Sequence, residues 1–322
     1  MDAPDDTPSP RRPSRVRSIA QFLLGVALFI GLLWWVVPSW DTVLESFSPS
    51  LPLLAVSLLG SLFATFVTAA RWKLLTEAMG TSPLRYGVYF HYLSLTRVVS
   101  QVLPSAVVDV LGRGAALRAA GSKAALGNLV APVVLERLFD LLLPLCMLAW
   151  AVLIHFGPGA GPLGPWGSLL LVTAAFAVGG VALLRPTVRL ALGALGKFRS
   201  LRGKTQPVTA PPNIPRPLAT KIMALSVGRY LGILGQYWGA GAGFGVTLGA
   251  LALVSAAPVA QLAGLIGITP GGLGFQEGGW VAALQQLGVA AGDIAVFMIA
   301  TRLMMLVNFG IFTLASWRYR RG

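Results

Sequence analysis

The chain has 322 residues, of which 55% are hydrophobic and only 11% are charged, and its formal net charge is +14. Soluble domains carry roughly 25% charged residues, so this composition predicts an integral membrane protein. With one cysteine and two histidines, a disulfide framework and a cysteine-based metal site are excluded, and we expect neither a metal nor a cofactor. No basic face with interleaved aromatic residues occurs, so we expect no nucleic acid partner.

Six apolar segments are long enough to cross a ~30 Å hydrocarbon core as helices, which takes about 20 residues. They are residues 19–37, 51–70, 126–154, 166–184, 222–238 and 294–317. Arg71, Trp72 and Lys73 end the second segment and predict an anchor at the membrane interface. The glycines of residues 239–245 predict close helix packing. The fold class is therefore predicted to be all-α, a polytopic membrane protein with about six full spans.

Lysine and arginine are unevenly distributed among the segments that connect these spans. They concentrate in residues 1–17, 71–85, 113–123, 185–221 and 318–322, whereas residues 39–50, 157–165 and 288–293 contain none. By the positive-inside rule the first set is cytoplasmic and the second is external. We expect the cytoplasmic (inner) membrane of a bacterial or archaeal cell, with both termini inside. Residues 1–17 are predicted to be a disordered tail, 185–221 a basic link that is flexible over 203–217, and 318–322 a basic tail.

Two further apolar segments are interrupted by proline. Residues 86–103 end at Pro104, and the basic residues around this segment predict that it enters and leaves on the cytoplasmic side. Residues 251–287 are interrupted by one proline and three glycines: Pro270, Gly271, Gly272 and Gly274. These residues cannot continue an α-helix, and a broken backbone at membrane depth persists only where protein or a polar cavity satisfies it. We predict two re-entrant hairpins, while the charges leave open two full spans for residues 251–287.

The spacing of these features indicates an internal repeat. The interval from Trp72 to Pro104 is identical to the interval from Trp238 to Pro270. An arginine–leucine pair follows each tryptophan, and the two intervals differ by a single position. The predicted repeats are residues 18–156 and 157–317. Because the first starts inside and the second outside, we expect inverted repeats with hairpins opening to opposite faces, an architecture typical of transporters.

Ionisable residues within these apolar segments are candidates for a functional site, because a charge in the membrane interior is costly. With the second hairpin break they form the predicted substrate-binding set: Arg97, Asp109, Arg113, Glu136, Arg137, Asp140, Pro270, Gly271, Gly272, Gly274, Glu277 and Arg302. Asp109 and Arg113 would share a helical face. The amides after Gly271 would begin a helix, a natural seat for a phosphate. Arg302 lacks an acidic neighbour within one turn, so Glu277 or a lipid phosphate is its expected partner.

Several of these residues also have a purely structural interpretation, which the sequence leaves open. Glu136, Arg137 and Asp140 would neutralise one another inside the bundle, as buried charges require. Arg97 would extend to the cytoplasmic interface. The hairpin break would be a structural turn that leaves Glu277 in water.

Four motifs carry a resemblance to a known family. They are Arg71-Trp72-Lys73-Leu74-Leu75, Leu103-Pro104-Ser105 with Asp109 and Arg113, Glu136-Arg137-Leu138-Phe139-Asp140, and Thr269-Pro270-Gly271-Gly272-Leu273-Gly274-Phe275-Gln276-Glu277-Gly278. Together they resemble the lysylphosphatidylglycerol synthase transmembrane (flippase-like) family. The chain departs from the family pattern after Pro104-Ser105, where members commonly have a Gly-Gly-Asp-like run and this chain has Ala106-Val107-Val108-Asp109, so that the aspartate is kept and the glycine pair is lost. It also departs at Gln276, where arginine is also familiar.

The resemblance implies a membrane domain that moves lipids between leaflets. Bifunctional members add a soluble aminoacyltransferase domain, but this chain ends at Gly322, so we expect no such activity. We predict a lipid flippase, not an enzyme, for an anionic or modified (aminoacyl- or glyco-) phospholipid or a polyprenyl-linked lipid. The alternatives are an enzyme of lipid modification or of lipid-linked glycans, with Glu136 and Asp140 as acid and base, and an accessory subunit or scaffold for a separate synthase or glycosyltransferase. A homo-oligomer is also compatible with the sequence.

Overall fold

The chain is almost entirely helical over the part that the structure describes. The computed structural model describes residues 15–37, 40–81, 84–103, 108–124, 126–157, 159, 161–200, 214–266 and 269–320. In chain order the helices are α1 (Arg15–Val36), α2 (Trp40–Ser46), α3 (Leu51–Ala78), α4 (Tyr86–Val99), the π-helix η1 (Val108–Gly112), α6 (Arg113–Ala119), α7 (Leu126–Phe156), the 3-10 helix η2 (Gly161–Leu163), α8 (Gly164–Ser200), α9 (Arg216–Gly243), α10 (Ala250–Gly264), α11 (Phe275–Gln286), α12 (Ala291–Ala315) and the 3-10 helix η3 (Trp317–Tyr319). The predicted all-α class is confirmed.

Five helical segments are long and apolar enough to cross a membrane. They are Ile19–Val36, Leu51–Ala78, Asn128–Phe156, Gly161–Leu184 and Ala291–Ala315. Each coincides with a predicted span, which confirms a polytopic membrane protein. The sixth predicted span lies in α9, a helix of 28 residues that is rich in glycine and carries Arg229. Because of this composition α9 is not among the five apolar helical segments, so the total of six membrane spans stays a prediction.

Two of the predicted connecting segments are wrong at their boundaries. The predicted tail extends to residue 17, but α1 begins at Arg15. The flexible portion of the predicted link, residues 203–217, overlaps the start of α9 at Arg216, whereas α8 continues through Pro186 to Ser200 within the rest of the link. Basic residues end the apolar stretch without ending the helix, because arginine and lysine are good helix formers. Most of the predicted flexible portion, and residues 1–14, lie outside the described residues.

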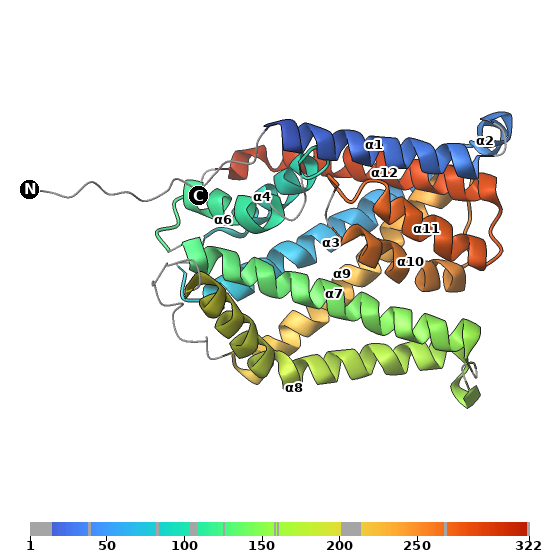
Figure 1. Ribbon diagram of the computed structural model, residues 1–322. Coiled ribbons are helices and arrows are strands. Elements are labelled where there is room, and N and C mark those ends of the chain that lie inside the picture. The colour runs from blue at the N-terminus through green and yellow to red at the C-terminus, as the bar shows by residue number, and fades with distance from the viewer. Residues whose placement is uncertain are drawn as a thin grey trace, which may run out of the picture.

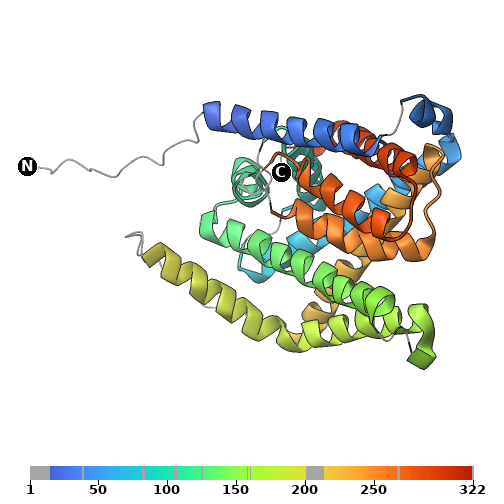
Figure 2. The same cartoon turned by 45° about the vertical axis from the view of Figure 1, so that its right-hand side comes forward.

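Two pairs of short helices interrupt the long ones. Toward the end of the molecule that carries the marked C-terminus, α4 packs against α6; toward the end that carries α2, α10 packs against α11 (Figures 1 and 2). With 12 residues, α11 is about 18 Å long and cannot cross the hydrocarbon core. Between α10 and α11 the backbone turns through three glycines with positive φ, namely Gly271, Gly272 and Gly274. The predicted break at Pro104 lies outside the described residues.

The long helices α3 and α9 form the central contact of the fold (Figure 1). Their backbones approach so closely that a Cβ atom on Gly60 would lie 2.6 Å from the backbone nitrogen of Gln236. A Cβ atom on Gly239 would lie 2.4 Å from the backbone nitrogen of Ser57. Small residues permit this approach in helices that lipid cannot drive together by the hydrophobic effect. The predicted packing role of the glycines in residues 239–245 is confirmed for Gly239.

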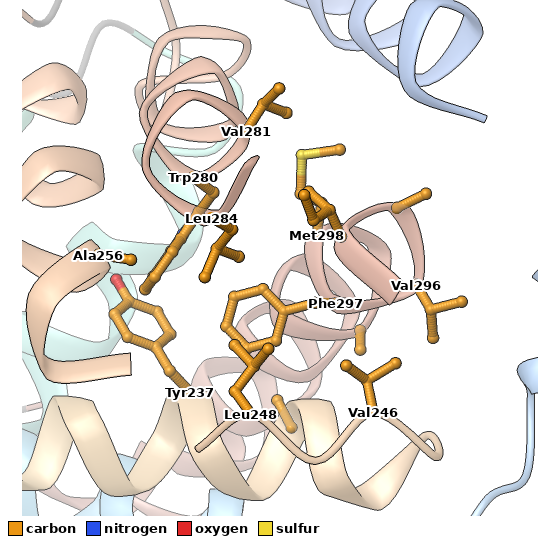
Figure 3. Packing of buried hydrophobic residues seen from close by; sticks show 14 of the residues in the cluster. Tyr237, Val246, Leu248, Ala256, Trp280, Val281, Leu284, Val296, Phe297 and Met298 are labelled. Atoms are coloured by element: carbon orange, nitrogen blue, oxygen red, sulfur yellow. The ribbon is translucent and has the colours of Figure 1, made fainter. Parts of the chain in front are cut away.

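An aromatic cluster holds α11 against α9 and α12. Figure 3 shows Trp280 of α11 between Tyr237 of α9 and Phe297 of α12. The ring centroids of Trp280 lie 5.0 Å from those of Tyr237 and 4.9 Å from those of Phe297, both in edge-to-face geometry. Trp280 is only 1% exposed. Because Glu277 lies one helical turn before Trp280, the same packing fixes the face of α11 on which Glu277 lies.

Both halves of the chain contain the same succession of helices. The start of α3 at Leu51 and the start of α9 at Arg216 are separated by the same interval as the starts of α7 at Leu126 and α12 at Ala291. A pair of short helices lies between the two long ones in each half. This succession follows the spacing in the sequence, and the inverted orientation of the two repeats stays a prediction.

Candidate functional site

A polar cavity of about 140 Å³ lies among α3, α4, α7, α9, α10 and α12, with the second hairpin turn at its edge. Three arginines line it: Arg97, Arg137 and Arg229. Its other polar residues include Gln101, Asp109, Asp140, Gln236, Tyr237, Gln261 and Gln276. In a protein of this hydropathy, a cluster of ionisable groups in the interior marks a candidate functional site.

The charges around the cavity form one continuous chain of alternating sign. In contact order its members are Arg229, Asp140, Arg71, Glu136, Arg113, Asp109 and Arg137. They come from α3, η1, α6, α7 and α9, so this single network joins the first hairpin to three long helices. The first and last members of this alternating charge chain, Arg229 and Arg137, line the cavity.

Asp140 joins α7 to α3 and α9. Its Oδ1 accepts a hydrogen bond from Arg71 Nη2 at 2.8 Å and lies 3.2 Å from Arg229 Nη1. Arg71 also donates from Nη1 to the hydroxyl of Ser226 on α9, at 2.9 Å. The Arg71 guanidinium is therefore held on three sides while its side chain is only 1% exposed. A buried charge of this kind is stable only when it is paired and hydrogen-bonded.

Glu136 is the central residue of the alternating charge chain and pairs with two buried arginines. Its Oε1 lies 3.3 Å from Arg71 Nε, and its Oε2 lies 2.5 Å from Arg113 Nη1. Arg113 packs over the Trp72 ring, with its guanidinium carbon 5.2 Å from the ring centroid. Glu136 is 2% exposed and is not among the residues that line the cavity.

The π-helix η1 places Asp109 at the junction of the first hairpin and α7. One carboxylate oxygen of Asp109 pairs with Arg137, and the other lies 3.8 Å from Arg113 Nε. π-helical turns are rare and occur frequently at functional sites. The predicted shared face of Asp109 and Arg113 is confirmed, although the closest partner of Arg113 is Glu136.

Arg97 differs from the other arginines around the cavity. Among the residues that the structure describes, no carboxylate lies within 4.0 Å of its guanidinium. Its side chain lines the cavity from α4 instead of extending to the interface, the alternative that the sequence left open. The alternating chain holds four arginines and three carboxylates, so these described residues together with Arg97 carry an excess of two positive charges. Of them, three arginines and two aspartates line the cavity itself.

Arg302 forms a second, smaller network at the other hairpin. It pairs with Glu277, the protein partner expected from the sequence. Its Nη1 also donates to the backbone oxygen of Gly271 at 3.0 Å and to Gln101 Oε1 at 3.3 Å. Arg302 thus connects the end of the first hairpin helix to the turn of the second hairpin.

The second hairpin turn does not provide the phosphate seat predicted at its helix start. The backbone amide of Gly274 donates to Glu277 Oε2 at 2.8 Å, so the first turn of α11 is capped by its own carboxylate. The amides of Gly272 and Leu273 are likewise occupied, since they donate to the backbone oxygens of Thr269 and Pro270. Gly272 and Gly274 serve packing, because a Cβ atom would lie 2.9 Å from the Gly264 oxygen and 2.4 Å from Leu28, respectively. Of the predicted turn residues, Gly271 lines the cavity, whereas Pro270, Gly272 and Gly274 do not.

Two expectations from the sequence are corrected by these contacts. Glu136, Arg137 and Asp140 do not neutralise one another, since each pairs with a residue of another helix. Arg71 is not an interface anchor, because it is buried between two carboxylates. Residues four apart on a helix share a face, so Glu136 and Asp140 both reach Arg71, whereas Arg137 points in another direction and reaches Asp109.

Sequence reasoning missed two arginines of the site, Arg71 and Arg229. Arg229 lies inside a predicted span, and the rule that flagged Arg302 could also have flagged it. Arg71 follows an apolar run beside Trp72 and Lys73, a pattern that is also typical of membrane boundaries. Only the tertiary contacts show that Arg71 is buried in the site and does not lie at the membrane boundary.

The fold and the cavity define an all-helical, multi-pass membrane protein with an arginine-rich polar site in its interior. The family model for the lysylphosphatidylglycerol synthase TM region matches residues 22–312, and the chain belongs to this family. This membership makes it a membrane protein of lipid metabolism or transport. No curated protein and no solved structure shows a significant match to the chain.

Proposed function

We propose that this protein is a flippase that moves an anionic or modified phospholipid, or a polyprenyl-linked lipid, between membrane leaflets. The observation that carries the proposal is the cavity with three arginines and an excess of positive charge in an otherwise apolar helical bundle. Arginine suits phosphate because its planar guanidinium donates two parallel hydrogen bonds. The headgroup would cross through the cavity while the acyl or prenyl chains stay in the bilayer.

The helical succession in the two halves supports a transporter over an enzyme. Inverted repeats with broken helices that meet at a central site are a recurrent transporter architecture. An enzyme would use Glu136 and Asp140 as acid and base, but Glu136 is held by two arginines and does not line the cavity. We therefore propose a non-enzymatic role in a cytoplasmic membrane, with both termini inside, and a separate synthase or glycosyltransferase as the source of the lipid.

Reconstitution in proteoliposomes tests the proposal. A fluorescent lipid in the inner leaflet, protected from an external quencher, should become quenchable at a rate that depends on the protein. Arg229→Gln removes an arginine that lines the cavity and should slow this movement at least about tenfold, as expected for loss of a hydrogen bond to a charged group. Arg85→Gln is the matched control, because Arg85 is exposed at the start of α4.

Two results would count against a flippase. Lipid movement at the rate of protein-free liposomes, with folded protein present, would contradict transport. A chemically altered lipid in the same vesicles, lost in Asp140→Asn, would favour the enzyme alternative. Leaflet-resolved lipid analysis of a deletion strain would then identify the lipid.

A further inference from the structure

We propose that the cavity selects a phosphoryl group with two negative charges, a phosphate monoester or a diphosphate, over a singly charged phosphodiester or an aminoacylated headgroup. This inference rests on the proposed transport function and narrows its substrate class. It is carried by the pairing of the charges around the cavity.

The carboxylates near the cavity are already held by arginines. Asp109, Glu136 and Asp140 belong to the alternating chain, and Glu277 pairs with Arg302. An aminoacylated lipid carries an ammonium group that needs a carboxylate when water is removed. Within the described residues, each carboxylate that could receive it would first have to release an arginine into the same cavity.

The arginines, in contrast, are in excess. Arg137 and Arg229 are the two ends of the chain, and each has one carboxylate partner that it shares with another arginine. Arg97 has no carboxylate within 4.0 Å among the described residues. These three side chains meet at one cavity with Asp109 and Asp140. The charge network around the cavity, counted with Arg97, carries two positive charges in excess. A group with two negative charges would neutralise this excess, whereas a monoanion would leave one buried charge uncompensated.

Neutral donors complete the lining of the cavity. Gln101, Gln236, Gln261 and Gln276 contribute amides, and Tyr237 contributes a hydroxyl that accepts from Gln276 Nε2 at 2.9 Å. The Nε2 atom of Gln261 is buried and has no hydrogen-bond partner in the part of the chain that the structure describes. A buried amide without a partner is costly, and a phosphoryl oxygen would accept its hydrogen bond.

Binding to purified full-length protein in detergent at pH 8 tests the inference separately from transport. At this pH a phosphate monoester carries close to two charges. The probes are dioleoyl phosphatidic acid, the phosphatidylglycerol and lysylphosphatidylglycerol with the same chains, and free pyrophosphate. We expect phosphatidic acid to bind about 10- to 100-fold more tightly than phosphatidylglycerol, as one additional charge-assisted contact provides. If pyrophosphate at the same concentration as phosphatidic acid displaces this lipid, the site is assigned to a free anion. If pyrophosphate does not displace it, the site is assigned to the lipid.

Arg97→Gln should bring the affinities of the two lipids together, Arg97→Lys should retain the preference, and Arg85→Gln should leave it unchanged. If Arg97→Gln does not fold, Gln261→Glu, which adds a negative charge to the lining, should abolish the same preference. Equal affinities in the unaltered protein, or tighter lysylphosphatidylglycerol binding, would overturn the inference even if lipid is transported. A clear preference without any lipid movement would keep the ligand class and refute the flippase.

Discussion

The alternating charge chain should be essential for stability, and Glu136→Gln tests this directly. The substitution retains the shape of the side chain and removes its charge. Two buried arginines then lose a negative partner, and one of them meets an amide NH2 in place of its acceptor, since Glu136 Oε1 lies 3.3 Å from Arg71, its Oε2 lies 2.5 Å from Arg113, and the side chain is 2% exposed. Breaking a buried ion pair from one side costs about 3–5 kcal/mol because an uncompensated charge remains. We expect a destabilisation of that size.

The single cysteine of the chain provides the assay. Cys146 lies on α7 and is partly buried in the helical core, so a thiol-reactive fluorophore will report its exposure as purified protein unfolds in detergent. Glu77→Gln is the matched control. It breaks the Lys73–Glu77 pair, in which both side chains are 29% exposed, and exposed pairs contribute about 0–1 kcal/mol. Equal losses of stability for Glu136→Gln and Glu77→Gln would refute the structural role of the alternating charge chain.

A double variant separates loss of charge pairing from loss of shape. Adding Arg113→Gln to Glu136→Gln removes one of the two arginines that the first substitution deprives of a carboxylate partner. If the cost comes from uncompensated charge, the double variant should be more stable than the sum of the single effects predicts. Additive losses would show that packing, not pairing, accounts for the effect.

Two further predictions concern helix packing and orientation. Gly239→Ala should reduce the yield of monodisperse protein, because its Cβ would lie 2.4 Å from the Ser57 nitrogen, whereas Gly31→Ala, with no atom within 4 Å, should not; equal yields would contradict close α3–α9 packing. Single cysteines can be placed at the exposed Lys123 and Ala290 in a Cys146→Ser background. An impermeant thiol reagent should react with the cysteine at 123 from the cytoplasmic side and with the cysteine at 290 from the external side. Reaction of both cysteines from the same side would exclude inverted repeats.

Hydrophobic runs predicted the long helices well, because a bilayer imposes one length and one polarity on every span. The hydrophobic pattern did not define where α8 ends, because polarity and helix formation diverge there and the helix continues beyond the apolar run to Ser200. It also located the ionisable residues of the site without their partners. Arg71 and Glu136 lie on helices far apart in sequence and meet only because α3 and α7 pack together. Such pairings depend on tertiary structure, so the local pattern around Arg71 equally allowed an interface anchor.

The distribution of contacts between the predicted repeats indicates which parts of the molecule could move during transport. α3 and α9 belong to different repeats, yet their backbones are in direct contact at Gly60, Gly232 and Gly239. Because glycines have no side chains that could repack, this contact does not favour a movement of one helix relative to the other. Near the cavity the repeats are also joined by polar contacts, which include Asp140–Arg229 at 3.2 Å, Gln101–Arg302 at 3.3 Å and Arg71–Ser226 at 2.9 Å. A bound anion competes for the same arginines and would weaken the first of these contacts.

We therefore expect α3 and α9 to act as a fixed axis, with the hairpins moving around the cavity. In a Cys146→Ser background, a cleavable cross-link between cysteines at Gln101 and Gly271 should stop lipid movement, since a Cβ on Gly271 would lie 2.7 Å from Gln101 Oε1. Cleavage of the linker should restore movement, which separates the cross-link from the effect of the substitutions. The same linker between Phe63 and Gly228, where a Cβ would lie 3.6 Å from the Phe63 ring, should leave movement intact. Inhibition by the second cross-link, reversed on cleavage, would show that α3 and α9 slide past each other and that the axis lies elsewhere.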